Sequence, residues 1–170
     1  MSTLTQEEVH RLLEYRDGKL FWKIPRRGVN KNSDGDYPVG WINGGGYWRL
    51  KLGDKSYYSH QIIYFMHHGY IPEFIDHIDN NKANNRIENL RSATKGQNNT
   101  NRPAAKANRL SRSRGVIPSA NGKRWHARVQ HNKKSIHLGT FDDLELADLV
   151  AMEARNLYHG AFAHHGLKGA

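Results

Sequence analysis

The sequence predicts a two-domain α+β protein. Helical and strand-like patterns both occur. Residues 102–111 look like a linker that divides the chain into two parts. The 170 residues, 37% of them hydrophobic, can bury one modest core or two small ones. Charge is uneven: the stretch from Arg102 to Phe141 holds ten Lys or Arg and no acidic residue, whereas the rest of the chain balances 16 basic against 16 acidic residues.

In the first part, helix and strand patterns alternate. Residues 5–16 predict a short helix, with Thr5 and Glu8 as its capping box and Asp17-Gly18 as its stop. Residues 60–68 have helical apolar spacing that Gly69 closes. Short strands are predicted at 20–22, 47–52 and 56–59, a loop at 26–36, and extended chain at 75–78.

Composition excludes several classes of protein. No run approaches the roughly 18 apolar residues that cross a bilayer, and the start MSTLTQEEVHRLLEYR is too acidic and polar for a signal peptide. We therefore expect a cytoplasmic protein without a membrane partner. The absence of cysteine excludes disulfides, iron–sulfur clusters, thiolate zinc sites and cysteine nucleophiles. Any metal must be held by His, Asp, Glu or Asn, which favours a hard cation.

The basic stretch predicts a polyanionic partner. Tryptophan and alternating apolar residues are interleaved with its charges, which indicates a folded surface for phosphates rather than a solvated tail. In the first part, Arg49 and Lys51 share one face of a strand that could lie against DNA. The aromatic residues of this part are expected to complete its core: Trp22, Trp41, Tyr47 and Trp48.

Asparagine dominates residues 80–101, with eight in 22 positions. Asparagine tolerates left-handed backbone and bonds its own main chain, so a turn-rich loop accounts for Asn80, Asn81, Asn84 and Asn85. The others need a different explanation.

Phosphodiester hydrolysis needs a base that activates water and a divalent cation that polarises the phosphate. Asp76 and His77 are adjacent on the predicted strand, and the Asp-Asn-Asn that follows favours a strand end there. A helix at 95–101 packed against that end could bring Asn98 to a cation shared with Asp76, leaving His77 to act on water. An isolated Asp-His pair is usually a surface ion pair, but the whole pattern within 23 residues favours a nuclease.

The run DHIDNNKANNRIENLRSATKGQNNTN resembles the HNH endonuclease family, particularly phage and intron-encoded homing enzymes. Asn89 lies twelve positions after His77, and Asn98 nine positions after Asn89, as in that family. The resemblance implies a ββα-metal fold in which Asp76 and Asn98 are metal ligands and His77 is the general base. It also implies that Asn89 braces the loop and orients His77. His60 matches a histidine common upstream in such enzymes, without an assigned role.

The metal expected from this resemblance is one Mg²⁺, or Mn²⁺, per active site. Many family members present a third histidine where this chain has Asn98, and some of those bind zinc. A carboxylate and an amide offer oxygen ligands, which suit the harder ions. Asn99 is the alternative to Asn98, because sequence alone does not fix the helical phase.

The second part predicts two strands, 125–130 and 134–138, and a helix at 144–158. The helix should cover the inner face of the sheet through one apolar stripe: Ala147, Val150 or Ala151, Ala154 and Leu157. The outer face then bears Arg128, Gln130, Lys133 and His137, which are types that contact phosphates or base edges.

The segment SRGVIPSANGKRWHARVQHNKKSIHLGTFDDLELADLVAMEARNLYHG resembles the AP2 DNA-binding domain, a three-stranded sheet backed by a helix. The resemblance implies DNA contacts from Arg112 and Arg114 on the first strand and then from Arg128, Gln130, Ser135 and His137. Lys133 and Lys134, two cations of the basic stretch, are expected to contact DNA as well. Plant members carry Glu and Trp in place of Arg128 and His137, so their target sequence does not transfer.

Together these observations predict an HNH nuclease domain with N-terminal helix and strands at 1–101, a basic linker at 102–111, an AP2-like domain at 112–160 and a tail at 161–170. The predicted activity is metal-dependent nicking of duplex DNA by a site-specific, homing-type endonuclease, with Arg86 and Arg91 clamping phosphates. Two alternatives are a non-catalytic DNA-binding regulator and a nuclease for RNA or branched DNA. No obligate protein partner is evident, and monomer and dimer both stay open.

Overall fold

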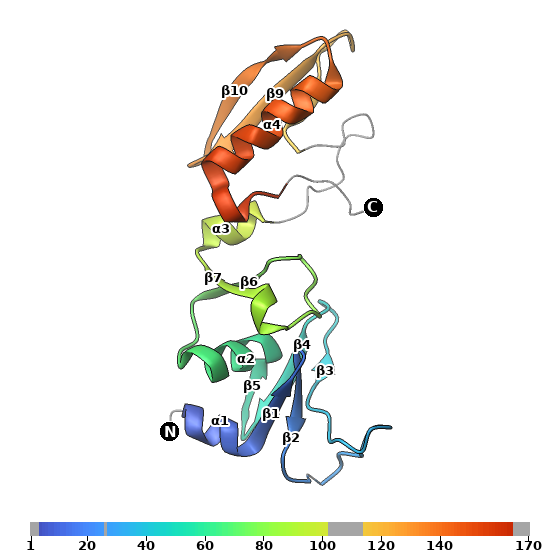
Figure 1. Ribbon diagram of the computed structural model, residues 1–170, viewed down its shortest axis with the longest axis vertical. Helices are drawn as coiled ribbons and strands as arrows, with labels where there is room; N and C mark the ends of the chain where they lie inside the picture. Colours follow the sequence, from blue (N-terminus) through green and yellow to red (C-terminus); the bar gives the residue numbers. More distant parts are fainter. Residues whose placement is uncertain (1–3, 26, 102–113, 165–170) are drawn as a thin grey trace. The chain divides into compact units, whose positions relative to one another are not determined.

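The computed structural model describes residues 4–25, 27–101 and 114–164 (Figure 1). The chain forms two compact units, residues 1–94 and 95–170. The first contains α1 (Gln6–Leu12), β1 (Leu13–Arg16), β2 (Lys19–Trp22), β3 (Trp41–Ile42), β4 (Trp48–Leu52), β5 (Lys55–Tyr58), α2 (Ser59–His68), β6 (Phe74–His77), η1 (Ile87–Asn89) and β7 (Leu90–Ala93). The second contains α3 (Lys95–Thr100), β8 (Val116–Pro118), β9 (Trp125–His131), β10 (Lys134–Phe141), α4 (Leu144–His159) and η2 (Gly160–Phe162).

The mixed helix and strand content predicted from the sequence is confirmed. Across the described ranges, no helix has the length and apolar character to span a membrane. The predicted linker, Arg112 and the last six residues lie outside the described residues.

The N-terminal helix is shorter than predicted. Its capping box is present, because Thr5 Oγ1 accepts the Glu8 N–H at 3.2 Å and the Glu8 carboxylate accepts the Thr5 N–H at 3.1 Å. The helix prediction is wrong for residues 13–16, which form β1 and pair with β2. Asp17 and Gly18 have φ of 47° and 80°, the left-handed backbone that a two-residue hairpin requires. The hairpin turn therefore prevails over helical propensity.

The middle of the first unit is an antiparallel sheet in the order β3-β4-β5, with α2 packed against it (Figure 1). Alternation along β4 buries Leu50 and Leu52, and the helical apolar spacing of α2 buries Ile62 and Met66. Gly69 ends the helix with a left-handed φ of 77°, again as predicted.

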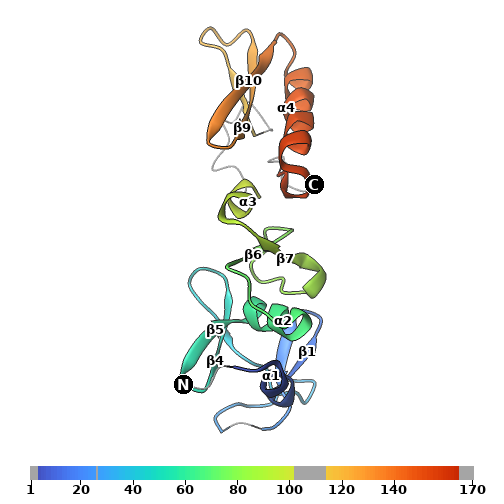
Figure 2. The same cartoon turned by 90° about the vertical axis from the view of Figure 1, so that its left-hand side faces the viewer.

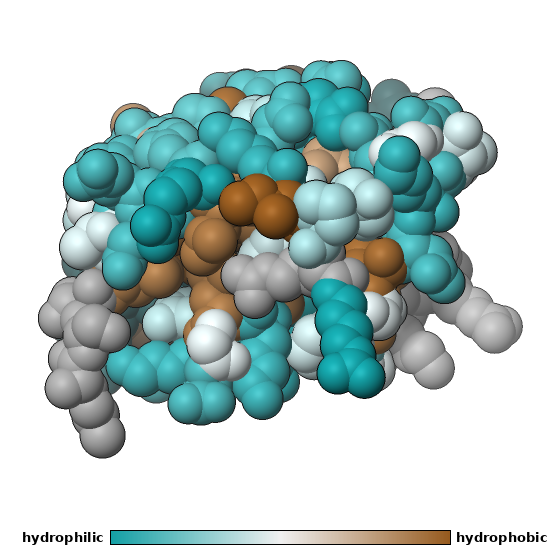
Figure 3. Space-filling view, turned by 90° about the horizontal axis from the view of Figure 1, so that it is seen from below, coloured by the Kyte–Doolittle hydropathy of each residue, from teal (hydrophilic) through white to brown (hydrophobic). Residues whose placement is uncertain are grey.

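The core of this unit is assembled from nearly all its elements. Its buried members are Val9, Leu13, Leu20, Val39, Leu50, Leu52, Ile62, Ile63, Tyr64, Met66 and Leu90. Trp22 packs against this core, but the expectation that Trp41 completes it is wrong, because Trp41 is 50% exposed on the two-residue strand β3. Seen from below, an apolar area is enclosed by hydrophilic side chains (Figure 3).

The antiparallel ribbon of β6 and β7 carries the Asp-His pair. Asp76 pairs with Arg91 in its register, and His77 pairs with Leu90. β6 ends at His77, as predicted, and the next turn places Asn80 at a left-handed φ of 60°.

The second unit is a three-stranded antiparallel sheet, in the order β10-β9-β8, with α4 along one face (Figures 1 and 2). Its buried core is small, consisting of Val116 and Ala127 from the sheet and Ala147 and Ala151 from the helix. β9, β10 and α4 lie where the sequence predicted two strands and a helix, and β8 adds a third strand.

Two residue placements in this unit correct the prediction. Leu157 is 81% exposed, because the buried helix positions run 147, 151 and 155 and so turn away from it. Arg155 takes the last buried position and donates from Nη1 to the carbonyl of Arg114. Arg114 itself precedes β8 instead of lying on it.

Candidate active site

Asp76 and His77 are the last two residues of β6, and both are buried, with 4% and 6% of their surfaces exposed. A solvent-facing ion pair would have left them accessible. Their burial therefore contradicts the surface-pair interpretation of this dipeptide. It also requires that each side chain has its polar groups satisfied.

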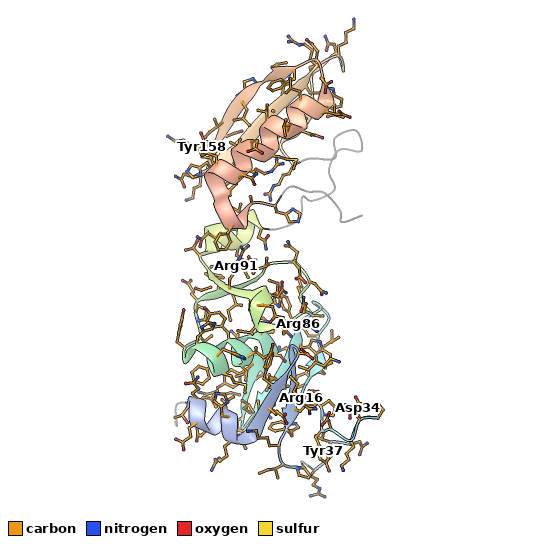
Figure 4. All side chains as sticks on the ribbon, in the orientation of Figure 1. Arg16, Asp34, Tyr37, Arg86, Arg91 and Tyr158 are labelled. Carbon is orange, nitrogen blue, oxygen red and sulfur yellow. The ribbon has the colours of Figure 1, made fainter. Side chains whose placement is uncertain are left out.

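Arg91 neutralises the buried Asp76 carboxylate. Its Nε and Nη2 lie 2.8 and 2.7 Å from Asp76 Oδ2, and its side chain is 17% exposed. Figure 4 labels Arg91 on β7. A buried carboxylate is costly unless it is paired, so this contact holds the acidic group in place. A phosphate clamp by Arg91 stays a prediction.

Asn85 contacts the ring of His77. The Asn85 amide oxygen lies 3.0 Å from His77 Nε2, and Asn85 is only 2% exposed. The sequence grouped Asn85 with the turn-forming asparagines, and nothing local distinguishes it from Asn84. Sequence reasoning therefore missed this residue, since burial eight positions from His77 is a property of the folded loop.

Asn89 braces the loop after β6, as the resemblance implied. Its side-chain amide donates to Asp79 Oδ1 at 2.9 Å and to the carbonyl of Asn84 at 2.8 Å, and its Oδ1 accepts the Asp79 N–H at 3.0 Å. The orienting contact to His77 that was expected from Asn89 comes from Asn85 instead. The side-chain amide of Asn89 makes its hydrogen bonds to Asp79 and to the loop backbone.

Asp79 is the hub of this loop. Burial raises the pKa of its carboxyl. Hydrogen bonds donated by Asn84, the Asn81 backbone and Asn89 lower this pKa by more than burial raises it, so the pKa of Asp79 lies below the ordinary value. The ionised carboxylate thus stabilises the folded loop.

His77, His60 and two tyrosine rings form an aromatic cluster. The His60 ring meets the His77 ring edge-on, with centroids 5.1 Å apart, and it stacks on Tyr58 at 5.4 Å. Tyr47 lies 6.1 Å from His77 and 5.7 Å from His60. Burial lowers the pKa of His60 to about 3, and the neighbouring His77 lowers it as well, so His60 is neutral at physiological pH.

Basic groups flank this aromatic cluster. Lys82 Nζ lies 4.8 Å from the centroid of the Tyr47 ring, and Arg49 Cζ lies 5.1 Å from that of Tyr58. Arg86, a predicted phosphate clamp, is half exposed at the other end of the loop, 3.8 Å from Asp17 and 3.9 Å from Glu88 (Figure 4).

The predicted metal ligands fall in different units. Asp76 lies in the first, whereas Asn98, half-buried, and Asn99, exposed, lie on α3 in the second. No group of three or more His, Cys, Asp or Glu that could hold a metal occurs in the described part of the chain. The donor chemistry of Asp76 nevertheless fits Mg²⁺, which prefers carboxylate oxygens and keeps several of its own waters.

The outer face of the second unit's sheet is open to solvent. The six predicted DNA-contacting residues of β9, β10 and the turn between them are all exposed: Arg128, Gln130, Lys133, Lys134, Ser135 and His137. Arg128 lies opposite His137 in the register, and Gln130 lies opposite Ser135. Arg114 is half-buried and donates from Nη1 to the carbonyl of Thr100 at 2.9 Å.

Comparisons with known proteins identify a segment of this chain that contains several of these residues. A family model described as HNH endonuclease matches residues 57–100, a range that includes His60, Asp76, His77 and Asn89. Protein 3.8 of Escherichia phage T7 is 32% identical over 120 residues, covering 67% of this chain and 98% of the relative. HNH nucleases generally act on DNA with a divalent metal ion. This chain is therefore a relative of Protein 3.8 that contains an HNH endonuclease domain at residues 57–100.

Proposed function

We propose that this protein is a metal-dependent endonuclease that nicks duplex DNA at specific sites, as a homing-type enzyme does. The observation that carries the proposal is the pair at the end of β6: a buried His77 held by Asn85, beside a buried carboxylate, Asp76, held by Arg91. The pair lies within the segment that matches the HNH endonuclease model.

In the proposed reaction, His77 takes a proton from a water molecule. The water oxygen forms a bond to phosphorus, the bond from phosphorus to the 3′ oxygen breaks, and solvent protonates the departing oxygen. A divalent ion, when bound, polarises the phosphate and stabilises the departing oxygen. Asp76 would hold this ion, Mg²⁺ or Mn²⁺, and the family resemblance adds Asn98, or Asn99, as a second ligand. Arg86 and Arg91 are proposed to contact neighbouring phosphates.

The second unit is proposed to supply grip on the duplex as an AP2-like domain of residues 112–160. Support comes from its exposed sheet face, where Arg128 and Lys133 offer charge and Gln130 offers a donor and an acceptor for base edges. The HNH nuclease domain is proposed to extend over residues 1–101, with a basic linker at 102–111.

Cleavage of supercoiled and pooled phage DNA tests the proposal. Wild-type protein in Mg²⁺ should convert supercoils to nicked circles, EDTA should abolish this, and His77→Ala should bind DNA without cutting it. His68→Ala, an exposed histidine at the end of α2, is the matched control and should cut normally. Linear product that appears without a nicked intermediate would contradict nicking.

A non-catalytic DNA-binding regulator is the second candidate, and the exposed basic face of β9 and β10 favours it. Salt-sensitive binding without cleavage of any DNA would support the regulator. Faster cleavage of RNA or branched DNA than of duplex DNA would instead indicate a different nuclease substrate.

A further inference from the structure

We propose that Asn85 and His60 are positioning residues for His77, with Asn85 selecting its tautomer and His60 fixing its ring orientation. This inference rests on the proposed function, because it concerns the tautomer and ring orientation of the proposed general base. Neither residue belongs to the Asp-His, Asn and Asn pattern that carried the family resemblance.

The tautomer follows from the hydrogen bond at Nε2. An amide oxygen only accepts, so the 3.0 Å contact to Asn85 Oδ1 requires the proton on His77 Nε2. The lone pair then resides on Nδ1, and a neutral imidazole with its lone pair on one defined nitrogen is what a general base needs. With both residues buried, competing water is scarce and the bond is correspondingly strong.

The Asn85 side chain is itself held in place by close packing of its backbone. A Cβ built on Gly18 would lie 3.0 Å from the Asn85 carbonyl carbon and 2.7 Å from the Arg86 nitrogen, so the β1–β2 turn approaches the loop as closely as glycine permits. Next to it, Tyr15 Oη accepts the Ile87 N–H at 3.0 Å. The hairpin thus fixes the backbone that carries the acceptor.

Ring orientation follows from the aromatic contacts. The hydrogen bond at Nε2 does not by itself fix the rotation of the His77 ring about the line from Nε2 to Asn85 Oδ1. The His60 ring, nearly perpendicular at 80° and 5.1 Å away, blocks that pivot on one side. Tyr58 stacks on the His60 ring and so restricts the movement of that ring.

His60 is proposed to act as a ring and not through its nitrogens. It is 8% exposed, and its Nδ1 is buried with no hydrogen-bond partner among the described residues. A nitrogen essential to the folded arrangement would have been partnered. Phenylalanine offers a ring of similar extent without that unsatisfied atom, so His60→Phe should be tolerated, whereas His60→Leu should not.

The tautomer can be measured directly by long-range ¹H–¹⁵N correlation on metal-free protein, because protonated and unprotonated ring nitrogens resonate far apart. Wild-type His77 should carry its proton on Nε2. Asn85→Leu, which removes the acceptor, should give a mixture, and Asn85→Asp, which retains an oxygen, should restore the single form. Asn81→Ala, an exposed asparagine of the same loop, should leave the spectrum of His77 unchanged.

Cleavage kinetics provide the second readout. Asn85→Leu and His60→Leu should lower kcat about 10²-fold with little change in KM, while His60→Phe stays close to wild type. A wild-type proton on Nδ1, or a single Nε2–H form that survives Asn85→Leu, would overturn the role of Asn85. Equal losses in His60→Phe and His60→Leu would overturn the role of His60. If Asn85→Leu fails to fold, the tautomer of wild-type His77 still tests the role of Asn85, and the comparison of His60→Phe with His60→Leu still tests the role of His60.

The tautomer measurement needs neither metal nor DNA. Failure of the proposed function would appear as no cleavage by wild-type protein in any metal, whatever the tautomer. Failure of this inference would appear as the wrong tautomer, or as unaltered kcat in Asn85→Leu and His60→Leu, in a protein that cleaves.

Discussion

Arg91 lies directly opposite Asp76 in the β6–β7 ribbon, and two of its nitrogens contact the same carboxylate oxygen. Cross-strand partners project to one face of a ribbon, so the register itself brings the charges together. The residue that neutralises the buried acid is therefore specified by strand pairing, fifteen positions away along the chain.

Arg91→Ala should destabilise the first unit by about 3 kcal/mol, because it removes both guanidinium contacts to the buried Asp76 carboxylate. Urea unfolding in metal-free buffer measures this. Arg86→Ala is the matched control, since its guanidinium is half exposed and its acidic neighbours lie near the limit of contact. It should change the free energy of unfolding by no more than about 0.5 kcal/mol. Similar losses in both variants would show that the Asp76 pair contributes no more than a surface pair.

Gly18→Ala should destabilise the protein more than Gly28→Ala does. Both glycines have a φ of 80°, so backbone strain is the same in the two variants. Only at Gly18 does the added methyl meet another segment, the backbone of Arg86 at 2.7 Å, whereas nothing lies within 4 Å at Gly28. Thermal melts give the difference, which should be at least about 1 kcal/mol. Equal effects would mean that the β1–β2 turn does not press on the backbone of Asn85 and Arg86.

Asp79→Asn should make the free energy of unfolding depend less on pH between about pH 3 and neutral pH. Because the folded pKa of Asp79 lies below its unfolded value, its contribution is present above about pH 4 and is lost as pH falls through the folded pKa. The wild-type advantage should thus be largest near neutral pH and shrink towards about pH 3. Urea midpoints at several pH values check this, with Asp54→Asn, at an exposed turn, as control. A constant difference at all pH values would contradict the linkage.

Arg128→Ala should weaken DNA binding and make its salt dependence shallower by about one counterion, if the side chain contacts a phosphate. Titrations at several salt concentrations measure both quantities. Arg11→Ala removes an exposed charge from α1 in the first unit and serves as control for net charge alone. Loss of affinity with an unchanged salt slope would indicate that Arg128 contacts a base edge.

Much of the fold could be predicted because its signals are local. The Thr5–Glu8 capping box, the closing Gly69 and the strand predicted at 47–52 each depend on residues close together in the sequence, and all three were confirmed. The error at residues 13–16 arose where two local signals competed and the Asp-Gly turn prevailed.

The sequence by itself determined the Asp-His and asparagine spacing that resembles the HNH family and the end of β6 at His77, because spacing and turn-forming residues carry that information. Tertiary structure alone decided that Asn85 contacts His77, that Arg91 pairs with Asp76 and that the His60 ring packs against the His77 ring. The physical reason is that these contacts join segments eight to seventeen residues apart through a loop and a strand register. Seven other asparagines between residues 80 and 101 offer the same amide, and only packing selects Asn85 as the one that is buried against His77.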